Sequence, residues 1–477
     1  MRKKIIYLLS LLMALSLVFA SCKKNGAGDI NGPGPGDNGF DNSPTTENGL
    51  APDQDWLDSN SEKPIKNDEI PNFQSIGGTA YFRNPVVVVM GSDGSDVVVF
   101  AEKRYKSLGA DNDIGVDGKT ATDIVSITSL DAGKKWGTPA IVGRNTEATT
   151  ENAVASPVVF KIDNSTVVVV ASAGAGLSRT SQDYDQRNPQ SKLMYAIGTY
   201  KDGTFTWTKT WTDMTDTIKT KVNASTVVNQ NSLSYKQFAV HSGRGFVNNS
   251  TLYLAVTIAD QGASLPNDNE AMGNIIFKAN YTSNSADLTW EEVSSSAVAF
   301  NMSSKNNYSS YKESRVISVT SDSDIKYIAV GNPYAGNNFI GYAKKSEQPK
   351  NTIAGSEGSP AYLEIKDWRG ATSYNPTEYN PETTGSKQQK LFAHVKDRNS
   401  TITMYGVGDN FTQNSAKTYT VIGFPKDDTT LAKSSSMDVL GDGTIVMVAE
   451  QGGSEKQYKI VCKRFTQKFL ATQLGLQ

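Results

Sequence analysis

Short runs of β-branched and other apolar residues recur along most of the chain, and each run is bounded by Asp, Gly, Asn or Ser. Apolar runs of this length between turn-forming residues predict β-strands. No stretch of useful length has the spacing of an amphipathic helix, so the pattern indicates an all-β protein. The clearest predicted strands are residues 85–90, 96–102, 157–162, 165–172, 251–258 and 443–450.

The strand-forming region covers about 400 residues, which by length alone corresponds to two or three domains. Repeated strand–turn–strand units allow a single β-propeller to contain that length, because four-stranded blades close around one axis. We therefore predict that residues 71–477 form one propeller domain.

The N-terminus has the pattern of an export signal. Arg2, Lys3 and Lys4 precede an apolar run, residues 5–19, that is shorter than the ~20 residues needed to span a bilayer. The run ends in Phe-Ala-Ser-Cys, which resembles a lipobox with Cys22 as the lipidated residue. We predict that residues 1–22 are a lipoprotein signal peptide. The mature protein would then be attached through Cys22 to the bacterial outer membrane, with the cell surface as one destination; an ordinary signal peptide is the alternative.

Residues 23–70 are rich in Gly, Pro, Asn, Asp and Ser and include the stretch GPGPGD. Such a segment cannot bury enough apolar surface to fold by itself. We predict that it is a disordered tether between the membrane anchor and the propeller.

Charge and residue usage disfavour several classes of function. The formal net charge is −2 and no basic stripe is present, which argues against nucleic-acid binding. Besides Cys22 there is only Cys462, so no internal disulfide is expected. With only His241 and His394 and no Cys/His cluster, zinc chemistry and a Ser-His-Asp triad are disfavoured. We expect no metal, no cofactor and a monomer.

Residues 129–136, SLDAGKKW, fit the pattern S-x-D-x-G-x-x-W, known as the Asp-box or BNR repeat. Asp and Gly favour a tight turn between two strands, and Trp136 is expected to pack the turn against its blade. By itself the motif could be one hairpin turn. Weaker copies of it follow in order along the chain, which favours a propeller: YKDGTFTW (200–207), SNSADLTW (283–290) and YGVGDNFT (405–412).

The motifs upstream of the Asp-box resemble those of exo-sialidases (neuraminidases). The stretch YFRNP, residues 81–85, resembles the FRIP motif of that family, with Asn84 in place of Ile. FAEKR, residues 100–104, is similar to the family's FAEGR, and Asp-Ile-Val at residues 123–125 leads into the Asp-box. The resemblance extends from about Gly77 to Leu470. It implies a six-bladed propeller that acts on the terminal sialic acid of glycans and glycoproteins.

The family binds the sialic acid carboxylate with three arginines, because a planar guanidinium donates two parallel hydrogen bonds to a carboxylate. The resemblance assigns the first of these to Arg83 and the third to Arg398, and it implies that Glu450 orients Arg83. Arg104, next to Glu102, is either a further ligand contact or half of a structural ion pair.

The family's catalytic groups are a Tyr nucleophile activated by a Glu, and an Asp that acts as general acid. The resemblance assigns the acid to Asp117, with Asp111 and Asp113 as alternatives, and the base to Glu313. Hydrolysis by this chain would need these two residues, with water or an unidentified Tyr in the nucleophile's role.

Two groups of the family pattern are missing at their expected positions. The second arginine is absent from residues 329–334, and Ser434 stands where the nucleophilic Tyr belongs. Arg315 follows Glu313 by two positions, so both would face one side of a strand, and Arg315 is a candidate replacement. The tyrosines that could take the nucleophile's role are Tyr81, Tyr311 and Tyr334.

Three functions remain open from the sequence. The chain could be a divergent exo-α-sialidase, a sialoglycan-binding protein without activity, or a protein-binding propeller whose sugar site has decayed. The missing tyrosine separates the first of these from the second, because it removes the family's nucleophile.

Overall fold

The computed structural model describes most of the predicted propeller, beginning at residue 80. The predicted signal peptide, Cys22 and the predicted tether lie outside the described residues. Among the residues that are described, no helix is long and apolar enough to cross a membrane. The described ranges are 80–105, 121–149, 152–174, 191–224, 235–260, 272–283, 287–293, 310–332, 339–344, 350–354, 359–368, 387–396, 401–409, 412–422, 432–452 and 458–476, without residues 134, 442 and 466.

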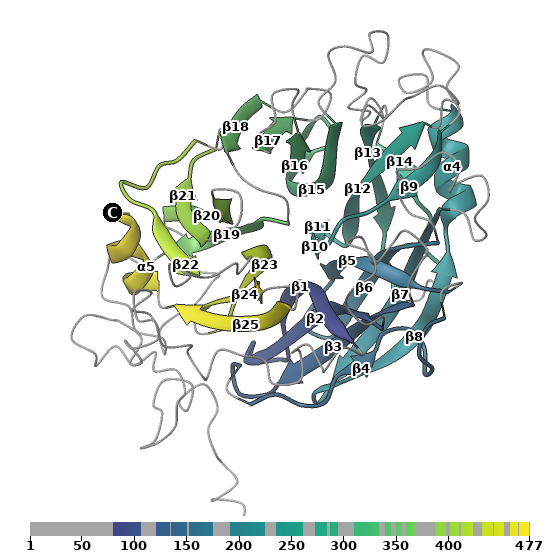
Figure 1. The fold of residues 1–477 in the computed structure, drawn as a ribbon, viewed down its shortest axis with the longest axis horizontal. Helices are drawn as coiled ribbons and strands as arrows, with labels where there is room; N and C mark the ends of the chain where they lie inside the picture. Colours follow the sequence, from purple (N-terminus) through teal and green to yellow (C-terminus); the bar gives the residue numbers. More distant parts are fainter. Residues whose placement is uncertain are drawn as a thin grey trace, which may run out of the picture.

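The described strands form six sheets that stand in a ring around a central axis (Figure 1). Successive strands of a sheet are antiparallel neighbours, so each sheet is one blade. The first three blades are β1 (Tyr81–Met90), β2 (Asp96–Arg104), β3 (Thr122–Ser129) and β4 (Ala140–Ile141); β5 (Val154–Lys161), β6 (Thr166–Ala173), β7 (Lys192–Lys201) and β8 (Thr204–Asp213); and β9 (Tyr235–Ala239), β11 (Phe246–Asn248), β12 (Thr251–Asp260), β13 (Met272–Asn280) and β14 (Glu291–Glu292).

The other three blades complete the ring, and the short strand β10 (Gly243–Arg244) runs parallel to β5 of the second blade. The fold is therefore the all-β propeller that the sequence predicted. These blades are β15 (Ser310–Ser321), β16 (Asp324–Asn332), β17 (Phe339–Lys344) and β18 (Lys350–Ala354); β19 (Ala361–Trp368), β20 (Lys387–Lys396), β21 (Thr401–Val407) and β22 (Tyr419–Ile422); and β23 (Ala432–Val439), β24 (Ile445–Gly452) and β25 (Tyr458–Phe465).

The ring closes where the first strand of the chain meets the last blade. The backbone N–H of Val87 donates to Ser436 Oγ at 3.2 Å, and that of Val89 donates to Asp438 Oδ2 at 2.8 Å. From the first bond to the second, the residue number rises by two on each strand, so β1 and β23 run side by side in the same direction. The innermost strands of the first and last blades therefore begin at one end of the axis and finish at the other.

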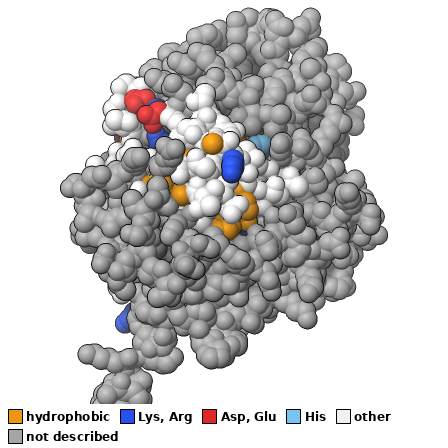
Figure 2. All heavy atoms as spheres, turned by 90° about the vertical axis from the view of Figure 1, so that its left-hand side faces the viewer, with side chains coloured by type: hydrophobic (Ala, Val, Ile, Leu, Met, Phe, Trp, Pro, Cys, Tyr) orange, Lys and Arg blue, Asp and Glu red, His pale blue; other side chains and the backbone are white. Residues whose placement is uncertain are grey.

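Buried apolar residues fill the space between neighbouring blades. One cluster joins the first blade to the last two, with Phe82, Val97, Leu391, Met447 and Phe465 among its members. The side of the molecule that carries β22 and α5 shows mostly polar and backbone atoms where it is described, with hydrophobic side chains in small separate groups (Figure 2).

Among the described residues, two short helices lie outside the sheets, whereas the sequence predicted none. Helix α4 (Thr215–Ala224) buries Ile218 and Val222, which are four residues apart and face one side. Helix α5 (Gln467–Leu474) follows the last strand. Each helix has only two or three turns, so its apolar stripe is too short to stand out in the sequence.

The Asp-box forms the predicted turn between β3 and β4. Ser129 Oγ accepts the backbone N–H of Gly133 at 2.8 Å and donates to Asp131 Oδ1 at 2.7 Å. Asp131 Oδ1 also accepts the N–H of Lys135 at 2.8 Å. Gly133 has a φ of 89°, a conformation that is unstrained only for glycine.

The three weaker copies occupy the same place in their own blades. Residues 200–207 span the turn between β7 and β8, residues 283–290 precede β14 after β13, and residues 405–412 lead from β21 toward β22. All four copies thus mark the connection between the third and fourth strands of a meander. Their order along the sequence reflects a repeated blade, as predicted.

Candidate functional site

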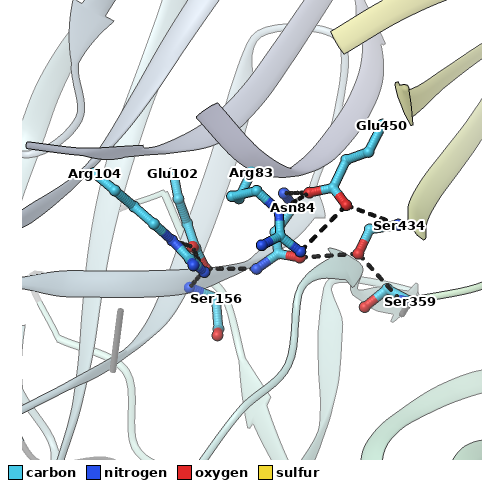
Figure 3. A network of polar contacts seen from close by, with 8 residues as sticks. All are labelled: Arg83, Asn84, Glu102, Arg104, Ser156, Ser359, Ser434 and Glu450. Atoms are coloured by element: carbon cyan, nitrogen blue, oxygen red, sulfur yellow. Dashed lines mark hydrogen bonds and ion pairs between the residues drawn. The ribbon is translucent and has the colours of Figure 1, made fainter. Parts of the chain in front are cut away.

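Arg83, which the sequence analysis placed at the centre of the site, lies near the start of β1 and is held by Glu450 of β24. Its Nε donates to Glu450 Oε1 at 2.8 Å and its Nη2 to Oε2 at 3.4 Å (Figure 3). The Glu450 side chain is fully buried, whereas 13% of the Arg83 side chain is exposed. The contact that the resemblance implied between these residues, 367 positions apart, is therefore present.

Asn84, the residue that replaces Ile in the family motif, connects both sides of this site. Its φ is 56°, and a bulge interrupts the pairing of β1 with β2 after Arg83. Its backbone N–H donates to Glu450 Oε1 at 2.6 Å, and its Nδ2 donates to Glu102 Oε1 at 2.8 Å. Its Oδ1 accepts the hydroxyl of Ser434 at 2.8 Å. Isoleucine could form none of the side-chain bonds.

Glu102 of β2 is a second buried carboxylate beside Asn84. It accepts Arg104 Nε at 2.7 Å, a further bond from Arg104 Nη2, and the backbone N–H of Ser156 at 2.7 Å. Burial by itself would raise the pKa of Glu102, but the charge of Arg104 and the hydrogen bonds outweigh burial, so its pKa is lowered. Arg104 thus forms the structural ion pair that the sequence left as one alternative, and a contact with ligand remains a prediction.

Ser434, at the position expected for the nucleophile, is 2% exposed. Besides donating to Asn84, its Oγ accepts the backbone N–H of Ser359 at 3.2 Å. Its own backbone N–H donates to Glu450 Oε2 at 3.1 Å. Figure 3 shows the serine joined to Glu450, Asn84 and Ser359, so that its hydroxyl is part of the wall of the site.

Two short sequence repeats mark the residues of this network. Asn84, Ser156 and Ser359 each precede a proline at or near the start of an innermost strand. An Ala-Glu pair ends at Glu102 in β2 and at Glu450 in β24, and each glutamate accepts the N–H of the residue before proline in the following blade. These repeats are the signal that could have predicted the network.

The other predicted site residues are only partly described. Asp117 lies outside the described residues, and so does Arg398, in the connection of β20 with β21. Glu313 belongs to β15, but its side chain is not among those described. The binding of one carboxylate by both Arg83 and Arg398 therefore stays a prediction. The roles of Asp117 as acid and Glu313 as base also stay predictions.

Arg315 lies on β15 and points into the ring. Its guanidinium donates to the carbonyl oxygen of Pro360, which precedes β19, and it lies against Gly243 of β10. A side chain at Gly243 would occupy the space of the guanidinium, which explains the glycine there. Arg315 is 7% exposed and lines a cavity beyond the network, whose wall does not include Arg83.

No group of three or more His, Cys, Asp or Glu side chains that could hold a metal ion occurs in the part of the chain that the structure describes. The two buried carboxylates of the site are each occupied by an arginine and by N–H donors. The site as described is therefore built to orient cationic groups, in particular the guanidinium of Arg83.

Comparison with solved structures places the fold among the sialidase β-propellers. A sialidase from Trypanosoma rangeli matches with a TM-score of 0.53 at 14% identity, over 83% of this chain and 55% of that one. The NanB sialidase from Streptococcus pneumoniae matches with a TM-score of 0.51 at 12% identity, over 87% of this chain and 72% of that one. A protein of unknown function from Dyadobacter fermentans matches with a TM-score of 0.50 at 12% identity, over 83% of this chain and 97% of that one.

No family model and no curated protein sequence matches the chain. At these low identities the structural matches concern the fold alone, and the chain covers little more than half of the Trypanosoma rangeli protein. The protein is thus a β-propeller of the sialidase fold, with an arginine held by a buried glutamate near the start of its first strand.

Proposed function

We propose that this protein binds terminal sialic acid of glycans through Arg83 and does not cleave it by the covalent route of sialidases. The observation that carries the proposal is the environment of Ser434, whose buried hydroxyl is bonded to Asn84 and Ser359 at the nucleophile's position. The sialidase fold and the pairing of Arg83 with Glu450 support the binding half of the proposal.

The orientation of Arg83 supports the proposed binding. Glu450 contacts the Nε and Nη2 atoms and fixes the plane of the guanidinium. A ligand carboxylate would approach the Nη edge, where two parallel N–H groups suit its two oxygens. Because Glu450 holds the guanidinium before the ligand arrives, little conformational freedom is lost on binding.

The surroundings of Ser434 support the proposal that this residue does not act as a nucleophile. An alcohol is a weak nucleophile unless an adjacent base takes its proton. The partners of this hydroxyl are the Asn84 amide oxygen, which is not a base, and the Ser359 N–H, which is a donor. Attack by Ser434 on a substrate would also require its buried hydroxyl to break its hydrogen bonds with Asn84 and Ser359.

A covalent probe tests the second half of the proposal. The sialidase of Trypanosoma rangeli has been solved with 2,3-difluorosialic acid as a covalent intermediate. We expect the intact mass of this protein to stay unchanged after incubation with the same compound. We also expect no release of fluorophore from a 4-methylumbelliferyl sialoside. Release that is lost in Asp117→Asn and in Glu313→Gln would overturn the proposal in favour of an exo-α-sialidase.

Binding is tested by calorimetric titration with sialyllactose. We expect saturable binding that Arg83→Ala weakens by at least about tenfold, a loss of about 1.4 kcal/mol. Lys103→Ala is the matched control, because Lys103 pairs with Glu147 at the surface and should leave affinity within about twofold. Thermal unfolding of each variant verifies that it folds. If the wild type binds no sialyllactose and releases no fluorophore, the protein-binding alternative replaces the proposal.

A further inference from the structure

A cavity whose lining does not include Arg83 lies among the innermost strands of the ring. It has a volume of about 490 Å³ and is lined by residues of innermost strands, among them Lys161 at the end of β5, residues 315–320 of β15 and residues 361–364 at the start of β19. Asn84 and Ser434 lie toward the starts of β1 and β23. Arg244, which lines the cavity, pairs with Asp438 near the end of β23, and the N–H of Val89 near the end of β1 donates to the same carboxylate. This part of the cavity is therefore displaced along β1 and β23 from Arg83 and Ser434.

The lining of this cavity is cationic. Its described lining contains Lys161, Arg244, Arg315 and Lys366, and Glu364 is the one acidic residue among these described residues. The chain as a whole has 47 basic and 49 acidic residues, so the excess of positive charge is a local feature of this cavity.

Asp438 forms an ion pair with Arg244, and both of its carboxylate oxygens already accept hydrogen bonds. Its Oδ1 accepts Arg244 Nη1 at 2.6 Å and the N–H of Val439 at 2.8 Å. Its Oδ2 accepts the N–H of Val89. Arg244 also donates to the carbonyl oxygen of Met437 at 3.0 Å. One buried acid therefore faces both Arg244 and Lys161.

Lys161 is the residue whose charge is least well compensated. Burial is the largest influence and lowers its pKa; Asp438 and Asp163 raise the pKa, Arg244 lowers it, and the net change is a fall. A desolvated ammonium beside a guanidinium is costly unless an anion is bound nearby. The inner end of the cavity adds a third cation, Arg315, which reaches the carbonyl of Pro360.

We propose that this cavity binds a small carboxylated or phosphorylated molecule between Lys161, Arg244 and Arg315. Guanidinium groups match the planar or tetrahedral oxygens of such anions. The hydroxyls of Ser318 and Ser436, which also line the cavity, add hydrogen-bonding groups. The volume is within the range of roughly 300–1,000 Å³ that is typical of small-molecule sites.

The test uses inorganic phosphate and citrate as probes, one for each class of anion, at constant ionic strength. We expect at least one of them to bind saturably in calorimetry and to raise the midpoint of thermal unfolding. Lys161→Met should weaken that binding by about tenfold or more, because it keeps the length of the side chain and removes its charge. Lys135→Met, at an exposed position on the Asp-box turn, is the matched control and should stay within about twofold.

Two further measurements separate this site from the Arg83 site and from loss of folding. Arg83→Ala should bind phosphate or citrate with the affinity of the wild type, whether or not it weakens the binding of sialyllactose. Without ligand, Lys161→Met should be at least as stable as the wild type, because it removes a desolvated charge. The proposal is wrong if neither anion binds saturably, or if Lys161→Met binds them as tightly as the wild type.

Discussion

Asn84 and Ser434 are two of the residues at which this site departs from the sialidase pattern, and the structure joins them by a hydrogen bond. The side-chain amide of Asn84 accepts a hydrogen bond from the Ser434 hydroxyl and donates one to the buried Glu102. The two departures are therefore physically linked: a polar residue in place of Ile gives the smaller hydroxyl a partner. The result is a polar, fully bonded wall beside Arg83.

Restoring the family residue by Asn84→Ile should destabilise the protein by about 2–5 kcal/mol. It removes two bonds to buried groups, and it places a β-branched side chain at a positive φ. Asn84→Gly tolerates the φ and loses only the side-chain bonds, so it should cost less, about 1–3 kcal/mol. Urea unfolding measures both. Equal stability of the Ile and Gly variants would contradict the strain argument.

Glu102 makes the stability of the fold sensitive to acid. Its pKa in the folded protein is below the ordinary value of 4.5, so its contribution is complete above that pH and is lost as the pH falls through the lower value. We expect the difference in unfolding free energy between the wild type and Glu102→Gln to shrink as the pH is lowered from neutral to below about 4.5. A difference that stays constant over this range would show that the charge of Glu102 contributes nothing.

At the scale of elements, the Asp-box turn is stabilised by its own side chains and by a neighbouring blade. Ala132, in the turn, donates its N–H to the carbonyl of Ser95 at 3.1 Å, and its carbonyl accepts Arg464 Nη1 of β25 at 2.9 Å. A turn that begins as a local motif thus also connects the first blade to the last.

Ser129→Ala should destabilise the protein by about 1–3 kcal/mol, because it leaves the buried N–H of Gly133 without its acceptor. Ser165→Ala is the matched control: Ser165 forms a similar turn with Asp163 but is exposed, so its loss should cost less than about 0.5 kcal/mol. Guanidinium unfolding of both variants tests the comparison. Equal costs would mean that the Asp-box hydroxyl has no special role.

At the scale of the whole molecule, the ring brings together strands from both ends of the propeller. Arg83 and Glu450 come from the first and last blades, and so do the partners in the bonds from Val87 to Ser436 and from Val89 to Asp438. The same closure places the cavity beside Lys161 among the innermost strands of the ring.

The predicted attachment of the whole molecule to a membrane can be tested on the full chain. We expect the wild type to enter the detergent phase of a Triton X-114 partition and to incorporate labelled palmitate, because acyl chains on Cys22 supply the apolar anchor. Cys22→Ser should stay in the aqueous phase and remain unlabelled. Cys462→Ala, at the buried second cysteine, should behave like the wild type. Labelling that persists in Cys22→Ser would disprove the assignment.

The sequence by itself predicted what depends on neighbouring residues. Apolar runs separated by turns with Gly or Asp predicted the strands, and the Asp-box copies predicted the repeated blade. Both patterns depend only on residues a few positions apart. The resemblance to sialidases also predicted the pairing of Arg83 with Glu450. The short helices escaped prediction because two buried residues, Ile218 and Val222, make too weak a pattern.

The tertiary structure decided the chemical environment of the site. Ser434 and Asn84 are 350 positions apart, and neither residue indicates by its type that it will bond the other. Lys161 and Asp438 likewise face each other only because β5 and β23 end at the same opening of the ring. Contacts of this kind arise from closure of the blades around one axis, which no local pattern of residues encodes.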